Sequence, residues 1–356
     1  MTSTRLLSRK RARTASPSSA SPSSASTSPA SARTARATRT SFAALTATIA
    51  LFAVTACGAS APAASNSNNA SASSSSTVAS GSTITVSHAQ GSTQVPANPQ
   101  NVYVFDLGVL DTMNALGLKA TGIPETVLPA SLKDFQGATK IGSMKEPDFE
   151  KISEGAPDLI IISGRTAGSY GELSKIAPTI DLSVDQKDAL NSFKKNAEII
   201  GDIYGKKAEV DAQLKEIDAK IAEVSAKGKD AGKSLVVMSS AGELTAYGAG
   251  SRFGLVHDIL KFPTDADIKS QGPHGEAVSF EFIKEKNPGI LFVVDRDSAM
   301  GTATGSSNAV LDNELVKSTD AAKNNKIIQL DATNWYNVGY GLNNTKSMID
   351  EVAKAL

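Results

Sequence analysis

Two stretches of the sequence decide the fold, and they repeat one another. Residues 149–165 read FEKISEGAPDLIIISGR, and residues 280–296 read FEFIKEKNPGILFVVDR. In each stretch a short helix is expected to begin at Phe-Glu, and a proline stands seven residues after the glutamate. A buried strand follows by its apolar run, and an arginine stands fifteen residues after the glutamate. Ordinary recurrence of βα units explains the apolar pattern but not the identical interval, so the sequence predicts two related α/β lobes.

The rest of the body, from Ser82 onward, alternates short β-type runs with amphipathic helical stretches. This alternation predicts an α/β fold with largely parallel sheets. A helix is expected over residues 109–116, ended by Gly117, and another over residues 343–356. Buried strands are expected at residues 102–105, 159–162, 235–238, 290–294 and 327–330.

The segment from residue 188 to residue 227 has a different pattern. Its apolar residues are spaced 4, 3, 4 and 3 apart, which is helical spacing over about four turns, and Lys and Glu fill the other face. These apolar residues are Val210, Leu214, Ile217, Ile221 and Val224. The pattern favours a long helix that connects the two halves. A coiled-coil dimer strand is the alternative, although the segment has fewer than three full heptads.

The charge of the chain is an average over two unlike parts. The whole chain has 36 basic and 36 acidic side chains, but residues 1–56 carry eight basic residues and no acid. The remaining 300 residues therefore have 28 basic against 36 acidic side chains, a net charge of −8. A body with this balance is not typical of a nucleic-acid binder, which needs a positive face. Its length suggests two domains or two lobes.

The first part of the sequence predicts export and anchoring rather than a fold. An uncharged apolar run covers residues 41–56, which is shorter than the roughly 20 residues of a spanning helix and is typical of a secretory signal peptide. It ends at Cys57, the only cysteine of the chain, so an internal disulfide and a cysteine-based zinc cluster are excluded. The alternative is a chance cysteine after the signal. The next residues, to about Ser82, are almost all Ala, Ser, Asn and Gly, which is typical of a flexible tether.

These patterns divide the chain into five parts. They are a signal peptide (1–56), a tether (57–82), an N-terminal lobe (83–187), connecting helices (188–230) and a C-terminal lobe (231–356).

Three arginines follow predicted strands or glycine-rich loops. Arg165 and Arg296 stand after the strands of the repeat, at the edge where ligands bind in open α/β sheets. Arg252 lies in the loop GAGSRFG, residues 248–254, which lacks the Gly-Lys-Ser/Thr ending of a phosphate-binding loop. Guanidinium groups suit oxyanions and aromatic planes, so we expect the three to bind a ligand in one cleft. The alternative for each is a surface ion pair.

Several motifs together resemble the ferric-siderophore substrate-binding lipoproteins of ABC importers, in their catecholate and petrobactin-binding branch. The resemblance covers about residues 84–356. It implies the class III periplasmic-binding-protein fold, with two Rossmann-like lobes joined by one long backbone helix and little hinge motion. The motifs are VFDLG (104–108), EPDFE (146–150), PDLIIISGR (157–165), AYG (246–248), GSRFG (250–254), HG (274–275) and VSFE (278–281).

The resemblance also implies roles for individual residues. Arg165, Arg252 and Arg296 match the pocket arginines that hold an anionic ferric siderophore. His274 and Tyr336 match a histidine and a tyrosine that complete the coordination of Fe³⁺ when the siderophore supplies only four donors, a ligand set that suits the metal. His274 as a hydrogen-bonding loop residue, and Tyr336 as a ring that stacks on the ligand, are the alternatives. Trp335 is expected beside the ligand.

Further implications concern anchoring and partners. Residues 54–58, VTACG, resemble a lipobox, which implies acylation (palmitate) of Cys57 and a lipid-anchored, extracellular protein. Glu150 and Glu281 match paired glutamates that meet the permease subunits of the transporter. Stabilisation of a helix dipole is their alternative role. A monomer without an intrinsic cofactor is expected.

Enzyme functions are disfavoured by the sequence. It contains neither a Gly-x-Ser-x-Gly elbow nor a His-Glu-x-x-His motif, and it has only three histidines. We expect His88 and His257 to be structural. Binding of cobalamin or haem is the alternative within the binding proteins, and a lipid-anchored extracellular hydrolase is the alternative of another class.

Overall fold

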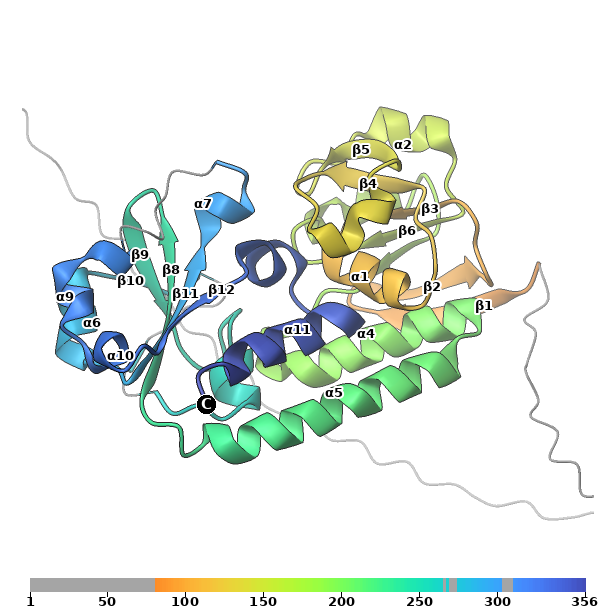
Figure 1. Ribbon diagram of the computed structural model, residues 1–356. Helices are drawn as coiled ribbons and strands as arrows, with labels where there is room; N and C mark the ends of the chain where they lie inside the picture. The colour runs from red at the N-terminus through yellow and green to blue at the C-terminus, as the bar shows by residue number, and fades with distance from the viewer. Residues whose placement is uncertain (1–80, 265–266, 269–273, 303–309) are drawn as a thin grey trace, which may run out of the picture. The chain divides into compact units, whose positions relative to one another are not determined.

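The computed structural model describes residues 81–264, 267–268, 274–302 and 310–356, and all of them belong to one compact unit. Within these residues the strands form two five-stranded sheets and one two-stranded hairpin (Figure 1). The signal peptide, Cys57 and nearly all of the tether lie outside the described residues. No helix among the described residues combines the length and the apolar character that a membrane crossing needs.

The first sheet is entirely parallel, with strand order β5-β4-β3-β6-β7. All four residues of β6 are buried, as its uninterrupted run of Leu and Ile predicts for a strand covered on both faces. The strands are β3 (Val102–Val104), β4 (Gly122–Glu125), β5 (Thr139–Ser143), β6 (Leu159–Ile162) and β7 (Thr179–Asp181), with β1 (Thr83–His88) and β2 (Gly91–Pro96) as the hairpin.

The helices of this lobe follow its strands. Helix α1 begins two residues before the predicted start, because the Asp106 carboxylate caps the backbone N–H of Val109. The α-helices are α1 (Leu107–Ala115), α2 (Phe149–Gly155) and α3 (Tyr170–Leu173), and the 3₁₀ turns are Ala130–Phe135, Ala167–Ser169 and Gln186–Asp188.

The second sheet is mixed, with strand order β10-β9-β8-β11-β12. β8, β11 and β12 are parallel, whereas β9 runs antiparallel to both of its neighbours. The strands are β8 (Ser234–Ser240), β9 (Glu243–Tyr247), β10 (Glu276–Val278), β11 (Ile290–Asp295) and β12 (Ile327–Leu330). The helices are α6 (Phe280–Lys286), α7 (Arg296–Ala299), α9 (Glu314–Lys317), α10 (Asp320–Lys323) and α11 (Leu342–Ala353), and two π-helical turns cover Leu255–Ile259 and Thr333–Val338.

The internal repeat of the sequence is a structural repeat. Helices α2 and α6 each have seven residues, and each begins at a side-chain cap, from Asp148 and Ser279 respectively. Each also ends in a left-handed residue, with φ of 42° at Ala156 and 41° at Asn287. A proline and a buried strand follow in both lobes. The shared boundaries explain why the interval from glutamate to arginine is the same.

Two consecutive helices connect the sheets. They are α4 (Ala189–Tyr204) and the 22-residue α5 (Lys207–Gly228), which lies beside α4 and α11 (Figure 1). The predicted apolar stripe of α5 is buried at four of its five positions, and Ile221 is partly buried against the same core. One hydrophobic cluster includes this stripe together with residues of both sheets, such as Val104 and Phe292. Helix α5 is therefore part of the core, and the predicted fold class is confirmed.

Candidate functional site

Each of the three arginines lies either shortly after a strand or within a tight loop. Arg165 follows β6 by three residues, and Arg296 is the first residue of α7, immediately after β11. Arg252 lies in the loop after β9, where Gly250 has φ of 67° and its N–H donates to the Asp258 carboxylate at 2.7 Å. A left-handed backbone of this kind favours glycine. The glycine at position 250 therefore allows the turn that precedes Arg252.

The three guanidinium groups surround the ring of Tyr336, which lies in the π-helical turn Thr333–Val338. The distance from the guanidinium carbon to the ring centroid is 4.4 Å for Arg252 and 5.4 Å for both Arg165 and Arg296. All three are within the range of a cation–π contact. The structure thus brings together four residues that the sequence predicted for one site.

Hydrogen bonds fix this arrangement. Nη2 of Arg165 and Nη2 of Arg252 both donate to the backbone carbonyl of Tyr336, at 2.6 and 2.9 Å. Nε of Arg296 donates to the Tyr336 hydroxyl at 2.9 Å, and its Nη1 donates to Oγ of Ser240 at 3.1 Å. Arginines from both lobes therefore share one tyrosine, and each guanidinium keeps further N–H groups for another acceptor.

The cluster carries an excess of positive charge. Among the described residues none of the three arginines forms an ion pair with a carboxylate. They are also the only arginines of the chain after residue 39. All other basic side chains in that part of the sequence, apart from the histidines, are lysines. Because Arg, unlike Lys, grips planar oxyanions through a rigid fork of donors, this distribution favours an oxyanion ligand.

The positive charges change the pKa values of the groups they surround. Burial raises the pKa of Tyr336, but the hydrogen bond from Arg296 and the charges of all three arginines lower it overall below its ordinary value. Burial and the neighbouring charge of Arg165 lower the pKa of Arg252. The hydrogen bond with Tyr336 raises the pKa of Arg296. The site therefore favours an anionic oxygen at its centre.

Three supporting residues were not predicted from the sequence. Ser240 accepts a hydrogen bond from Arg296, and Sδ of Met144 accepts a weak one from Nη1 of Arg165 at 3.4 Å. Phe253 lies under Arg252, with 5.2 Å between the guanidinium carbon and the ring centroid. Phe253 directly follows an arginine already singled out, whereas no sequence signal marks Ser240 or Met144.

Trp335 lies next to Tyr336 in the chain but points into the core. Its side chain is buried, its Nε1 donates to the Glu351 carboxylate at 3.0 Å, and its ring meets Phe253 edge to face at 6.0 Å. In this structure Trp335 supports the site from below through Phe253 and Arg252. The buried indole therefore does not lie where the sequence placed it, beside a ligand.

His274 is not part of the arginine–tyrosine cluster in this structure. It is exposed, two residues before β10, and it forms no hydrogen bond or ring contact with Tyr336 or the three arginines. Within the described ranges no group of three or more His, Cys, Asp or Glu side chains could hold a metal ion.

The other two histidines have local partners. Nδ1 of His257 is 2.9 Å from the Phe262 carbonyl, and burial lowers the pKa of His257. Nε2 of His88 is 2.9 Å from Oγ1 of Thr93 on the paired strand. These contacts agree with the structural roles expected for both residues.

The two glutamates of the repeat are exposed and occupy equivalent positions. Glu150 and Glu281 are each the second residue of their helix, in the first turn of α2 and of α6. Hydrogen bonds from its own backbone N–H and from Ser279 lower the pKa of Glu281. Beside Glu281 lies a groove of about 580 Å³, lined also by Glu243 and Phe280.

Comparison with known proteins identifies the family. Residues 102–333, more than half of the chain, match the family model described as periplasmic binding protein. The petrobactin-binding protein YclQ of Bacillus subtilis (strain 168) is 43% identical over 281 residues, which are 77% of this chain and 88% of that protein. The ferric-anguibactin-binding protein FatB of Vibrio anguillarum (strain ATCC 68554 / 775) is 31% identical, over 76% of this chain and 87% of that protein.

Solved structures agree with the sequence relatives. The crystal structure of YclQ superposes with a TM-score of 0.74, over 77% of this chain and 98% of that one. The periplasmic catecholate-siderophore binding protein VctP from Vibrio cholerae gives a TM-score of 0.72 at 33% identity, over 77% of this chain and all of that one. This protein is therefore a member of the periplasmic binding protein family.

Proposed function

We propose that this protein is the substrate-binding component of an ABC importer, and that it captures an anionic ferric siderophore with catecholate groups. The observation that carries the proposal is the cluster of three arginines around Tyr336, none of which forms an ion pair with a carboxylate in the part of the chain that the structure describes. The names of the relatives support it: YclQ is a petrobactin-binding protein, FatB binds ferric anguibactin, and VctP binds a catecholate siderophore. Its family and these relatives are binding proteins, and this protein is likewise a binding protein and not an enzyme.

The chemistry of capture follows from the donors that the cluster offers. A complex of Fe³⁺ with catecholate groups carries a net negative charge. Each catecholate oxygen can therefore accept charge-assisted hydrogen bonds from a guanidinium group. Arg252 is partly buried, and a charged hydrogen bond is stronger in such a place than in water. An anionic complex replaces the solvent around the arginines and neutralises their mutual repulsion. Ferric catecholates should therefore bind, whereas the less negatively charged ferric hydroxamates should bind weakly, and titration with both complexes tests the proposal.

Tyr336 is proposed to donate its phenolate oxygen to iron. Replacing it by phenylalanine keeps the ring and removes the oxygen, so Tyr336→Phe should weaken binding of a ferric bis-catecholate, which leaves coordination positions open on the metal. A loss of roughly tenfold or more is expected, because a hydrogen bond to a charged group already contributes about 1.5–3 kcal/mol. Calorimetric titration measures it.

The control for this variant is a hexadentate tris-catecholate complex, which needs no oxygen from the protein. Its affinity should change little in Tyr336→Phe. Equal losses for both complexes would rule out coordination and favour the hydrogen bond between Arg296 and the hydroxyl as the common cause. Unchanged affinity for both would leave only stacking by the ring.

Glu150 and Glu281 are proposed to dock the two lobes on the permease. Their equivalent places in α2 and α6 and their exposure support this. The double change Glu150→Gln and Glu281→Gln should reduce siderophore-dependent iron uptake by cells severalfold while the purified protein binds its ligand normally. Glu154→Gln with Glu285→Gln, one turn later in the same helices, is the matched control. Normal uptake by the first pair would contradict docking through these residues.

We propose that Cys57 carries a lipid and holds the protein at the outer face of the cell membrane. The lipobox-like residues 54–58 and the tether after them support this. Replacing Cys57 by alanine should release the protein into the medium, because the proposed acyl anchor is then lost. Fractionation of cells with an immunoblot measures this. Retention of the variant in the membrane fraction would contradict the anchor.

A further inference from the structure

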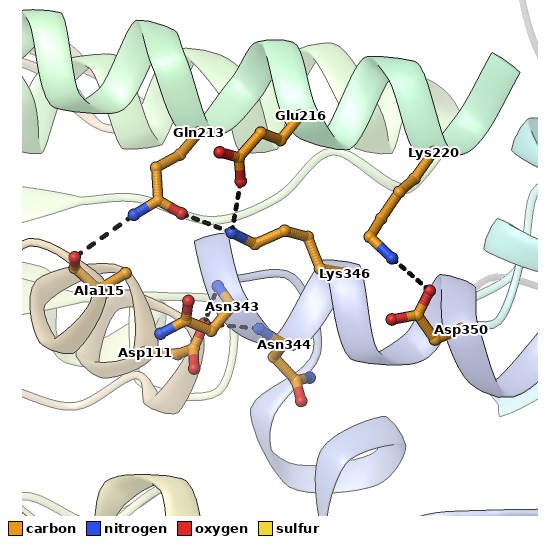
Figure 2. Close-up of polar contacts among 9 residues, drawn as sticks. All are labelled: Asp111, Ala115, Gln213, Glu216, Lys220, Asn343, Asn344, Lys346 and Asp350. Atoms are coloured by element: carbon orange, nitrogen blue, oxygen red, sulfur yellow. Dashed lines mark hydrogen bonds and ion pairs between the residues drawn. The ribbon is translucent and has the colours of Figure 1, made fainter. Parts of the chain in front are cut away.

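A buried carboxylate of the N-terminal lobe caps the last helix of the chain. Asp111 lies in α1, and its side chain is 1% exposed. Its Oδ2 accepts hydrogen bonds from the backbone N–H groups of Asn343 and Asn344, both at 2.8 Å, in the first turn of α11 (Figure 2). The N-cap residue of α11 is Gly341, which has no side chain to do this. The cap of α11 is therefore supplied by a residue more than 200 positions earlier in the sequence.

The next link leads from α11 to the turn that carries Tyr336. Nδ2 of the buried Asn344 donates to the carbonyl of Asn334 at 3.0 Å and to that of Gly339 at 2.7 Å. Asn334 is the second residue of the turn Thr333–Val338, and Gly339 directly follows it. One amide group thus holds both ends of the turn. Tyr336 lies in the sequence between Asn334 and Gly339, whose carbonyls accept from the Asn344 amide.

The backbones of α1 and of this segment are in close contact. A Cβ on Gly108 would lie 2.1 Å from the carbonyl oxygen of Tyr340, and a Cβ on Gly341 would lie 2.5 Å from Oδ2 of Asp111. Both glycines are therefore required by the approach of the two segments. Lys346 adds a further tie, since its Nζ donates to Gln213 at 2.7 Å and to Glu216 at 3.1 Å on α5 (Figure 2).

We propose that Asp111 and Asn344 are positioning residues for the ligand site, which hold the Tyr336 turn at the place where the arginines of both lobes meet it. This inference rests on the proposed function. Its physical reason is the geometry of the Tyr336 carbonyl, which accepts from Arg165 of one lobe and Arg252 of the other. A small displacement of the turn lengthens both bonds and spreads the arginines, and preorganisation of this kind is sensitive to shifts of about 1 Å.

Asp111 holds α11, and Asn344 of α11 holds the turn. A role of these residues in positioning the turn can be distinguished by experiment from a role in stabilising α11 alone. A simple cap contributes to folding and leaves the affinity of the folded protein unchanged. A positioning residue changes the affinity of the folded protein, and it does so through Tyr336. The effect of its removal should therefore shrink when Arg252, whose hydrogen bond to the Tyr336 carbonyl it maintains, is already absent.

The test compares Asn344→Ala and Asp111→Asn with Asn343→Ala. Asn343 is the neighbouring asparagine, and its side chain has no hydrogen bond among the described residues, so Asn343→Ala keeps the backbone bond to Asp111 and is the matched control. With the purified full chain, stopped-flow and equilibrium titration with a ferric bis-catecholate should show roughly 10- to 100-fold weaker binding for Asn344→Ala. The loss should lie mainly in faster dissociation, and Asn343→Ala should bind as the wild type does.

Each outcome separates the alternatives. If Asn344→Ala does not fold, Asp111→Asn, which keeps the shape and one acceptor oxygen, gives the same reading with a smaller loss. In the Arg252→Ala background the effect of Asn344→Ala should be clearly smaller than in the wild type. Wild-type affinity in folded Asn344→Ala and Asp111→Asn, together with weaker binding by Arg252→Ala, would overturn this inference alone. A wild-type protein that binds no ferric complex would overturn the proposed function and the inference with it.

Discussion

Arg252→Ala is expected to weaken binding of an anionic ferric catecholate more than removal of either of the other two arginines. Arg252 is the arginine closest to the Tyr336 ring, and it also lies over Phe253. Its removal deletes a cation and its donors from a partly desolvated place. Charged hydrogen bonds contribute about 1.5–3 kcal/mol each, so an affinity loss of roughly 10- to 100-fold is expected for this change. Arg165→Ala and Arg296→Ala should give smaller losses in the same direction.

Two comparisons make the Arg252 result specific. Arg252→Lys keeps the charge but not the planar fork, and it should recover only part of the affinity. Lys229→Ala removes a surface cation at the end of α5 and should leave binding unchanged. The melting temperature of Arg252→Ala should stay near that of the wild type, because no carboxylate loses a partner. Unchanged affinity in all three alanine variants would contradict the pocket.

Gly108→Ala is expected to have the largest effect on stability. Its Cβ would lie 2.1 Å from the Tyr340 carbonyl oxygen and 3.0 Å from that of Val338, both of them backbone atoms that cannot rotate away. Overpacking of this kind costs about 1–3 kcal/mol, and more where the backbone must move. Differential scanning calorimetry should show a melting temperature lower by roughly 5 °C. The displaced segment leads directly to the Tyr336 turn, so ligand binding should weaken as well.

Gly171→Ala is the matched control for this change. Gly171 lies in helix α3, and a Cβ there would meet nothing within 4 Å. Alanine also has the higher helix propensity, so this variant should be as stable as the wild type or more stable by up to about 1 kcal/mol. Equal melting temperatures for Gly108→Ala and the wild type would show that α1 and the segment after Val338 are not in close contact in solution.

The elements that the sequence predicted are those with strong local signals. The buried strand at residues 159–162, the connector stripe on α5 and the repeat of α2 and α6 all follow from short-range patterns, and the structure confirms them. The three arginines were recognisable because each follows a strand or a glycine-rich loop, where parallel sheets and tight turns direct side chains to one edge. That they and Tyr336 serve one ligand site was implied by the family resemblance rather than by spacing, and their direct contacts with Tyr336 were not predicted.

The remaining features depend on contacts between distant parts of the chain. The bond from Asn344 to Asp111 joins residues 233 positions apart, and no local pattern marks either residue. Trp335 and Tyr336 are adjacent, yet one points into the core and the other toward the arginines, because consecutive residues of a helical turn face different directions. The antiparallel place of β9 in the second sheet likewise depends on pairing rather than on composition.

The most direct test of ligand capture is the fluorescence of Trp335, the only tryptophan of the chain, during titration with four complexes. Trp335 lies under Phe253 and next to Tyr336, so an iron complex held by the arginines should quench its emission. Saturable quenching by a ferric catecholate, with little effect of a ferric hydroxamate, haem or cobalamin, is the expected result. Saturable quenching by haem or cobalamin alone would contradict the proposed ligand while leaving the fold intact.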